Sequence, residues 1–370
     1  MQFKNFLAAV FCAADTRLRR GVLLLFVSAL VSVSCDCFDR DPIFEYPHDG
    51  GIDPTLVTVN ITYHCCKDIP LYTIVHLTKS KQDEIVRRYY FEVLSEDGEA
   101  VKTLYIEREY NDLSDITMSL SLPAGSYKAV MWQDCTSEYG VPFYNPANLK
   151  QIKIPSADGY YGCTDTKDAS CATTLLDIPE TDEWNVQVSY EENLERPLSK
   201  ISFISTDGPL FVHKCSEYLQ TKTSATISEI RERFYLRFFY EGYILTGYNA
   251  ERDEFNGSKM GYSFDGTLEA TDNPSNMFLG YDYVFVNGEE GVFWIVLQII
   301  DSADGKIIVE TNKIRVPVKR GQETIVMDDL LTTYWGQSIA IDPDFNGEFN
   351  FIIGSSSLLM QAQNSLKNIG

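Results

Sequence analysis

The stretch "ITMSLSLPAGSYKAVMW", residues 116–132, decides the fold class of this chain. Apolar and polar residues alternate on both sides of Pro123-Ala124-Gly125. Side chains of a β-strand point to opposite faces in turn, so this alternation predicts two half-buried strands. The proline and the glycine supply the backbone conformations that a tight turn between them needs.

The same alternation extends in both directions along the chain. Further strands are expected at residues 58–64, 71–78, 89–107, 172–179, 184–190, 198–206, 235–250, 281–288, 292–300 and 307–327. Isoleucines at helical spacing predict one short helix within residues 223–234. Residues 136–172 are polar and are expected to form a long connection with little regular structure. Many short strands with few amphipathic helices are typical of an all-β protein built from β-sandwiches.

The predicted strands divide into two modules. We expect an N-terminal β-sandwich at residues 55–181, a C-terminal β-sandwich at 182–336, and a final strand and tail at 337–370. One order of elements occurs twice, first around Asp97-Gly98 and again around Asp304-Gly305. Each Asp-Gly turn is followed by strands and a glycine turn, which favours two copies of one plan.

An apolar run at residues 21–33 lies near the start of the chain. As a helix it would be roughly 20 Å long, shorter than the hydrocarbon core of about 30 Å. Arg17, Arg19 and Arg20 precede this run, and such a positive flank is typical of a signal peptide. Residues 1–34 are therefore predicted to be a signal peptide rather than a membrane span.

The end of the apolar run, Ser32-Val33-Ser34 before Cys35, resembles the lipobox of bacterial lipoproteins. In that family the cysteine carries a diacylglycerol, the leader is removed, and the new amino terminus is acylated. The resemblance implies lipid attachment at Cys35, although Ser32 departs from the usual Leu or Val. Acyl chains contribute about 0.8 kcal/mol per buried methylene, so two or three would hold the protein on the membrane. The alternative is an ordinary secretory signal followed by a bystander cysteine.

Residues 35–54 form an acidic, turn-prone tether. Acid close behind the cysteine resembles the surface-export signal of Bacteroidetes lipoproteins, which implies a lipid-anchored, surface-exposed protein of the outer membrane. In enteric bacteria, Asp36 would instead favour retention at the inner membrane. The net charge of −22 repels phosphate backbones, so nucleic-acid binding is not expected.

An odd number of cysteines remains after Cys35, so they cannot all pair within the chain. They are Cys37, Cys65, Cys66, Cys135, Cys163, Cys171 and Cys215. Cys163 and Cys171 enclose the polar loop "CTDTKDASC" and are the best local candidates for a disulfide. The "HCC" at 64–66 invites a metal site, but neighbouring strand side chains face opposite ways and no second cluster occurs. No metal is therefore expected.

Catalytic and cofactor motifs are absent from the sequence. It has no G-x-S-x-G elbow, phosphate-binding loop or dinucleotide fingerprint, so neither an enzyme nor a cofactor is expected. "DPDFNG" at 342–347 matches the opening of a calcium loop, but Ile353 stands where a bidentate glutamate belongs. A turn into a strand fits that segment better. The 22 tyrosines and 21 phenylalanines suit sandwich cores, and exposed ones could stack on sugars.

Several quoted stretches together resemble one family. They are "LPAGSYKAVMW" (122–132), "LERPLSKISFIST" (194–206), "LGYDYVFVNG" (279–288), "IRVPVKRGQETIVMDDLLT" (314–332) and "IDPDFNGEFNFII" (341–353). With the lipobox, they resemble the FimB-type fimbrial anchor and accessory lipoproteins of Bacteroidetes. This resemblance implies two tandem transthyretin-like, Greek-key β-sandwich domains.

The resemblance also implies a structural role in a fimbria or adhesion apparatus. Stalk subunits of that family are cut after an arginine, which opens a groove for a strand of a neighbouring subunit. Here only Arg40 could serve, and it lies in the tether, so an anchor-like or accessory protein is favoured. The expected partners are fimbrial subunits, by strand addition or edge contact. The alternative is a surface lipoprotein that binds glycan or host protein through exposed aromatic side chains.

Overall fold

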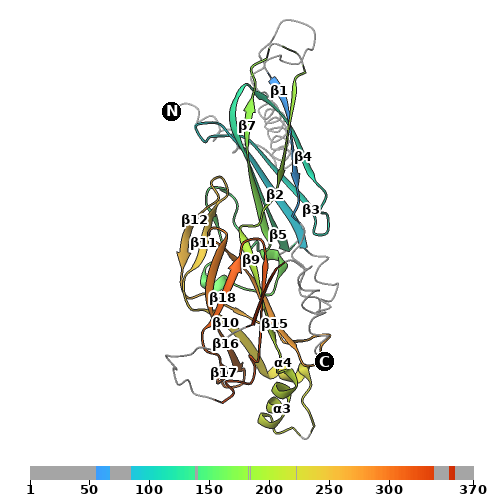
Figure 1. Ribbon diagram of the computed structural model, residues 1–370, viewed down its shortest axis with the longest axis vertical. Coiled ribbons are helices and arrows are strands. Elements are labelled where there is room, and N and C mark those ends of the chain that lie inside the picture. The colour runs from blue at the N-terminus through green and yellow to red at the C-terminus, as the bar shows by residue number, and fades with distance from the viewer. Residues whose placement is uncertain are drawn as a thin grey trace, which may run out of the picture. The chain divides into compact units, whose positions relative to one another are not determined.

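The computed structural model describes residues 56–66, 85–137, 141–181, 183, 185–221 and 223–336, and the backbone of one further strand, Asn350–Gly354. Strands dominate these residues, and α3 and α4 are the α-helices among them (Figure 1). The all-β prediction is confirmed. The predicted signal peptide, Cys35, the tether, the strand at 71–78 and the calcium-like loop at 342–347 lie outside the described residues.

Two sheets, A and B, pack face to face in the N-terminal half. The strand order in sheet A is β4 (Ile116–Pro123), β1 (Leu56–His64) and β8 (Gln187–Asn193). The order in sheet B is β3 (Ala100–Glu109), β2 (Ile85–Leu94), β5 (Gly125–Ser137) and β7 (Ala169–Ile178). Strand β1 is antiparallel to β4 and parallel to β8. Val59, Phe91 and Met118 belong to the buried core between the two sheets, as the alternation predicts.

Two larger sheets, D and E, form the second sandwich. The order in sheet D is β14 (Glu269–Ala270), β15 (Met277–Phe285), β9 (Leu198–Ser205), β19 (Glu323–Asp328) and β20 (Asn350–Gly354). The order in sheet E is β13 (Ser263–Asp265), β10 (Phe234–Tyr240) and β16 (Glu290–Asp301), followed by β17 (Ile307–Glu310) and β18 (Ile314–Lys319) on the far edge of β16. Phe203, Leu297 and Ile325 lie in their common core.

The remaining elements join these sheets. Helices α3 (Gly208–Tyr218) and α4 (Ile227–Arg233) connect β9 to β10. The predicted short helix is α4, which Thr226 and Glu229 begin with a capping box. Helix α3 was not expected from the sequence. Sheet C has the order β12 (Glu254–Lys259), β11 (Ile244–Asn249) and β6 (Ile152–Lys153), and two 3-10 turns, η2 (Ala157–Gly159) and η3 (Asp165–Lys167), precede β7.

The two sandwiches repeat one topology. In sheets A and D, β1 corresponds to β9, β4 to β15 and β8 to β19, because each first strand is antiparallel to one neighbour and parallel to the other. The chain crosses from sheet A to sheet B at Pro123-Ala124-Gly125, and from sheet D to sheet E at Asn287-Gly288.

The turns matched from the sequence are not equivalent in this plan. Asp97-Gly98 joins β2 to β3, whereas Asp304-Gly305 joins β16 to β17. Both glycines have positive φ, 77° and 72°, so the turn prediction was right while the alignment of the two copies was wrong. A turn residue permits a sharp reversal of the chain, but it does not specify the pairing partner of the strand that follows the turn.

The strand expected at the start of the second module is β8, which pairs with β1 in sheet A. Its half-buried Val188 and Tyr190 pack on the first core. The connection at 136–172 has little regular structure before β7, as predicted, and its side chains Phe143, Tyr144 and Tyr160 are buried. The described residues all belong to one compact unit. No helix among the described residues is long and apolar enough to cross a membrane.

Candidate functional site

The outer face of sheet B, the face turned away from sheet A, is covered rather than exposed. Leu94, Val130 and Trp132 on this face belong to the same buried cluster as the core of sheets D and E. The Trp132 ring lies between Tyr144 of the connecting segment and Tyr248 of β11, at centroid distances of 5.5 and 5.8 Å. The two sandwiches therefore share an apolar interface, and residues 141–168 are part of it.

A buried ion pair lies beside Trp132. Arg88 Nε and Nη2 donate to the two carboxylate oxygens of Asp134 at 2.7 and 2.8 Å. Trp132 Nε1 donates to Asp134 at 3.0 Å, and the Arg88 guanidinium lies 5.4 Å from the centroid of the Tyr90 ring. Burial raises the pKa of the Asp134 carboxyl, and the hydrogen bonds from Arg88 oppose that rise. The planar fork of Arg88 and its partners satisfy this carboxylate without water.

A second buried pair, Lys167 and Asp282, joins the connecting segment to β15. The two side chains are in direct contact and neither is exposed to solvent. Asp282 also accepts hydrogen bonds from the hydroxyls of Tyr160 and Tyr240, both at 2.7 Å and both to Oδ2. The main-chain N–H of Tyr283 donates to Oδ1 at 2.8 Å. One carboxylate thus has four polar partners and no contact with water.

Aromatic rings surround the Lys167 ammonium. The Nζ atom lies 3.8 Å from the centroid of the Tyr160 ring and 4.5 Å from that of Phe143. It also donates to the main-chain carbonyl of Tyr161 at 3.0 Å. Burial lowers the pKa of the Lys167 amine, and the charge of Asp282 opposes that shift. The lysine is therefore held in a fixed position inside an apolar cage.

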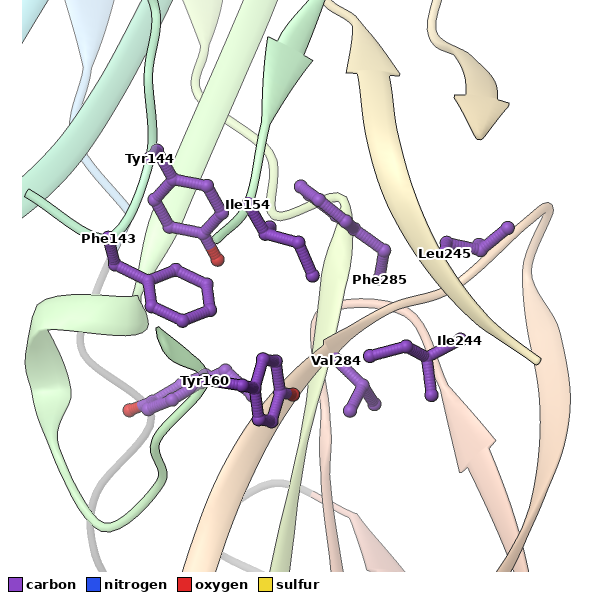
Figure 2. A pocket seen from close by; sticks show the side chains of 9 residues that line it. Phe143, Tyr144, Ile154, Tyr160, Ile244, Leu245, Val284 and Phe285 are labelled. Atoms are coloured by element: carbon purple, nitrogen blue, oxygen red, sulfur yellow. The ribbon is translucent and has the colours of Figure 1, made fainter. Parts of the chain in front are cut away.

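A small cavity borders this cage. Figure 2 shows the rings of Phe143, Tyr144 and Tyr160 on one side and Val284 and Phe285 of β15 on the other. Its volume is about 10 Å³, which is room for roughly one water molecule. The cavity is too small for an organic ligand, so it is not a cofactor or substrate site.

The disulfide predicted between Cys163 and Cys171 is not present in the structure, where both cysteines are free and their sulfur atoms have different neighbours. Cys163 Sγ lies 3.7 Å from the main-chain oxygen of Asp265, whereas Cys171 Sγ lies 3.0 Å from the hydroxyl of Tyr248. Burial raises the pKa of each thiol to about 12. The two cysteines flank η3, which directs Cys163 towards sheet E while Cys171 lies within β7.

The "HCC" cysteines face different partners, as strand geometry predicts. Cys65 Sγ lies 3.7 Å from the Tyr89 hydroxyl, whereas Cys66 contacts the main-chain oxygen of Leu194. His64 Nδ1 lies 3.0 Å from an Asp115 carboxylate oxygen. Across the described ranges, no group of three His, Cys, Asp or Glu side chains is arranged to hold a metal ion.

The edges of sheets A and D differ. Thr58 N–H donates to the Val186 carbonyl at 2.9 Å, so the main-chain groups of Val186 and of every second residue after it point towards β1. The main-chain groups of the residues between them, such as Ser189 and Glu191, point away from β1. No strand within the described part of the chain pairs with that edge of β8. On the equivalent strand of sheet D, β19, the same edge pairs with the C-terminal strand β20.

The outer face of sheet E, the face turned away from sheet D, is open to solvent. Trp294 and Val292 on β16 are 45% and 43% exposed. A surface hollow of about 290 Å³ lies beside them, lined in part by Val292, Arg315 and Pro317. Single exposed apolar residues are ordinary, but an exposed tryptophan next to a hollow lined by apolar and charged residues marks a candidate contact surface.

Sequence reasoning did not single out Lys167 or Asp282. A signal was present, because Asp282 is the charged residue in the otherwise uncharged run "MFLGYDYVF" that forms β15. A buried aspartate needs a partner, so its position in this run indicates that a buried cation or hydrogen-bond donors must come from another part of the chain. The identity of that cation was not predictable, because Lys167 lies 115 residues away.

Comparison with known proteins places the chain in a family without defining its role. No curated protein matches the sequence. Three solved structures have a similar arrangement at low identity. A candidate polysaccharide-binding protein of Bacteroides thetaiotaomicron VPI-5482 is 10% identical, with a TM-score of 0.44 over 81% of this chain and 98% of that one.

The other two come from Porphyromonas gingivalis. The fimbrial anchor protein Mfa2 is 10% identical, with a TM-score of 0.39 over 80% of this chain and 98% of that one. The tip fimbrial protein Mfa3 is 10% identical, with a TM-score of 0.42 over 81% and 99%. A family model matches residues 54–367, and the chain therefore belongs to the family of unknown function DUF6562.

Proposed function

We propose that this protein is a lipid-anchored, surface-exposed structural component of a fimbria or adhesion apparatus, in an anchor-like or accessory role. The lipobox-like segment before Cys35 supports the anchor. The likeness of the quoted sequence stretches to FimB-type lipoproteins supports the fimbrial role. The protein is proposed to hold neighbouring subunits rather than to catalyse a reaction.

The observation that carries this proposal is the difference between the outer edges of β8 and β19. Sheet D uses a strand from the end of the chain, β20, to satisfy the edge of β19. The outward main-chain groups of Ser189 and Glu191 on β8 would accept a strand in the same way. Unpaired strand edges are templates for added strands, because each added residue satisfies main-chain donors and acceptors.

A proline substitution tests this edge. Ser189→Pro removes an outward N–H without removing a hydrogen bond to β1, and Ser189→Ala is the matched control that keeps it. We expect Ser189→Pro to reduce co-purification of a fimbrial subunit several-fold and Ser189→Ala to leave it unchanged. Full co-purification with Ser189→Pro would remove the edge mechanism. Normal fibre attachment in a deletion strain would remove the anchor role.

The lipid is tested separately. Metabolic labelling with a radioactive fatty acid should mark the wild-type protein and not a Cys35→Ser variant, which should leave the membrane fraction. A labelled Cys35→Ser variant would place the lipid elsewhere, and an unlabelled wild-type protein would support an ordinary secretory signal.

A second candidate function, glycan binding, rests on the Trp294 surface. A tryptophan ring offers a flat apolar face to a sugar ring, and Arg315 and Glu290 at the hollow could bind hydroxyl groups. A glycan array should then show binding that Trp294→Ala abolishes. Leu175→Ala is the control, because Leu175 is 71% exposed on a different sheet. Equal binding by wild-type and Trp294→Ala proteins would eliminate this surface.

A further inference from the structure

The contact between Lys167 and Asp282 has the arrangement needed for a covalent bond. Lys167 Nζ touches Asp282 Oδ1, and the carbonyl carbon Cγ lies one bond beyond that oxygen. Neither side chain is exposed, so water does not compete for either group. We infer that Lys167 and Asp282 form an intramolecular isopeptide bond, Nζ to Cγ, after the chain has folded.

This pair can form an amide because its cation is a lysine rather than an arginine. Arginine supplies the cation in the neighbouring buried pairs, Arg88–Asp134 and Arg196–Asp168. A guanidinium does not lose its proton in a protein and is not a nucleophile. A lysine amine becomes nucleophilic when burial disfavours its charged form, and burial lowers the pKa of Lys167.

The reaction balances without any further reagent. A proton passes from Nζ to Oδ1, which converts the ion pair into a neutral amine and a carboxylic acid. The Nζ lone pair then attacks Cγ, and the Cγ–Oδ1 bond breaks. Oδ1 leaves as water, carrying the first proton and a second proton from Nζ. An ammonium and a carboxylate thus become one neutral amide and one water molecule.

The surrounding residues fit each stage of this reaction. The hydroxyls of Tyr160 and Tyr240 donate to Oδ2, where negative charge develops when Nζ attacks Cγ. The Tyr283 N–H donates to Oδ1, the departing oxygen. The cavity beside Tyr160 has room for roughly one water molecule, the quantity released. Exchange of a desolvated ion pair for a neutral amide also removes two buried charges.

The bond would join two segments that belong to different sandwiches. Lys167 ends η3, two residues before β7 of sheet B, whereas Asp282 lies within β15 of sheet D. A covalent link there would connect the two sandwiches directly, and it would resist pulling forces that an ion pair does not withstand. This inference does not depend on the proposed function.

Mass spectrometry of the full-length protein, purified from cells and digested with trypsin, tests the bond. We expect one branched peptide that joins the segments containing Lys167 and Asp282 and is lighter than their sum by one water molecule. Trypsin should not cleave after Lys167. The solvent-accessible pair Lys128–Glu251 is the internal control and should give linear peptides. Linear peptides cut after Lys167, recovered from the folded wild-type protein, would overturn the inference.

Two variants separate a bond from a simple ion pair. Lys167→Arg keeps the positive charge but cannot form the amide, so it should give linear peptides and migrate more slowly on a denaturing gel than wild-type protein. Tyr240→Phe removes one donor to Oδ2 and should slow bond formation, seen as a mixture of linked and unlinked peptides after brief expression. If Lys167→Arg does not fold, the wild-type digest still decides the question.

Discussion

The outer faces of sheets B and E carry the same kind of ion pair in opposite surroundings. On sheet B, Arg88 pairs with Asp134 through two hydrogen bonds of 2.7 and 2.8 Å. On sheet E, Arg237 pairs with Asp265 at 2.7 and 3.3 Å. The side chains of the first pair are 8% and 0% exposed, and those of the second are 36% and 58% exposed. Their geometry is similar, but only the first pair is isolated from water.

The tryptophans on these faces differ in the same way. Trp132 is fully buried, whereas Trp294 is 45% exposed. The cause is the connecting segment before β7 and the sheet C hairpin, which cover the outer face of sheet B. The same sandwich plan thus gives two different outer faces. The outer face of sheet B is covered and contributes to the core, whereas none of the described residues covers Trp294 on sheet E in the same way, which leaves that face available for contacts. Substitutions on each face should therefore differ in their effect on the free energy of unfolding and on solvent access.

The largest effect is expected for Asp134→Ala. It leaves the Arg88 charge buried without its carboxylate and the Trp132 N–H without an acceptor. Removal of one member of a buried pair lowers the free energy of unfolding by about 3–5 kcal/mol. Asp265→Ala on the exposed face should cost only about 0–1 kcal/mol. Urea unfolding measures both, and equal losses would contradict the distinction between the two faces.

Thiol labelling gives the next largest effect. Cys171 lies opposite Trp132 in sheet B, and burial raises the pKa of its thiol from 9.0 to about 12. At pH values below 9, its thiolate fraction, and with it alkylation by iodoacetamide, should fall about a thousandfold relative to unfolded protein. A Val292→Cys variant on the exposed face of sheet E should react near the unfolded rate. A Cys171 that stays unlabelled after denaturation would indicate a disulfide after all.

Gly280→Ala should have a smaller effect. Gly280 has a φ of +135°, and an added Cβ would lie 2.8 Å from Cys163 Sγ of the connecting segment. Strain of this kind costs about 1–3 kcal/mol. Gly242→Ala is the control, since its Cβ would meet nothing within 4 Å and its φ is not positive. Denaturation midpoints compare the two, and an unchanged midpoint for Gly280→Ala would mean that the segment packs loosely there.

Local signals predicted most of the strands, whereas long-range pairing could not be predicted. Alternation placed the half-buried strands, and isoleucines at helical spacing indicated the helix that the structure shows as α4. Neither signal carries information about the partner of a strand, so β8 was assigned to the wrong sandwich. Helix α3 was missed because it buries only four of its residues, which leaves its sequence without a clear apolar stripe.

The candidate site was less predictable than the fold. Lys167 stands in a polar loop whose sequence resembles an exposed connection, and it is buried by the rings of Phe143 and Tyr160 together with Asp282 of β15. The same loop favoured a disulfide, because spacing alone does not reveal which way Cys163 and Cys171 point. Buried polar partners distant in sequence are fixed by tertiary packing, which no period or motif within one segment encodes.

The smallest effect on stability is expected for Trp294→Ala. Nearly half of this side chain is in water, so its removal should change the free energy of unfolding by no more than about 0.5 kcal/mol. Trp132→Ala, which removes a fully buried ring, should cost about 3–5 kcal/mol. A large loss for Trp294→Ala in urea unfolding would mean that another part of the chain covers sheet E. A small loss of unfolding free energy together with impaired binding to a partner or a glycan would identify Trp294 as a residue that contributes to binding rather than to stability.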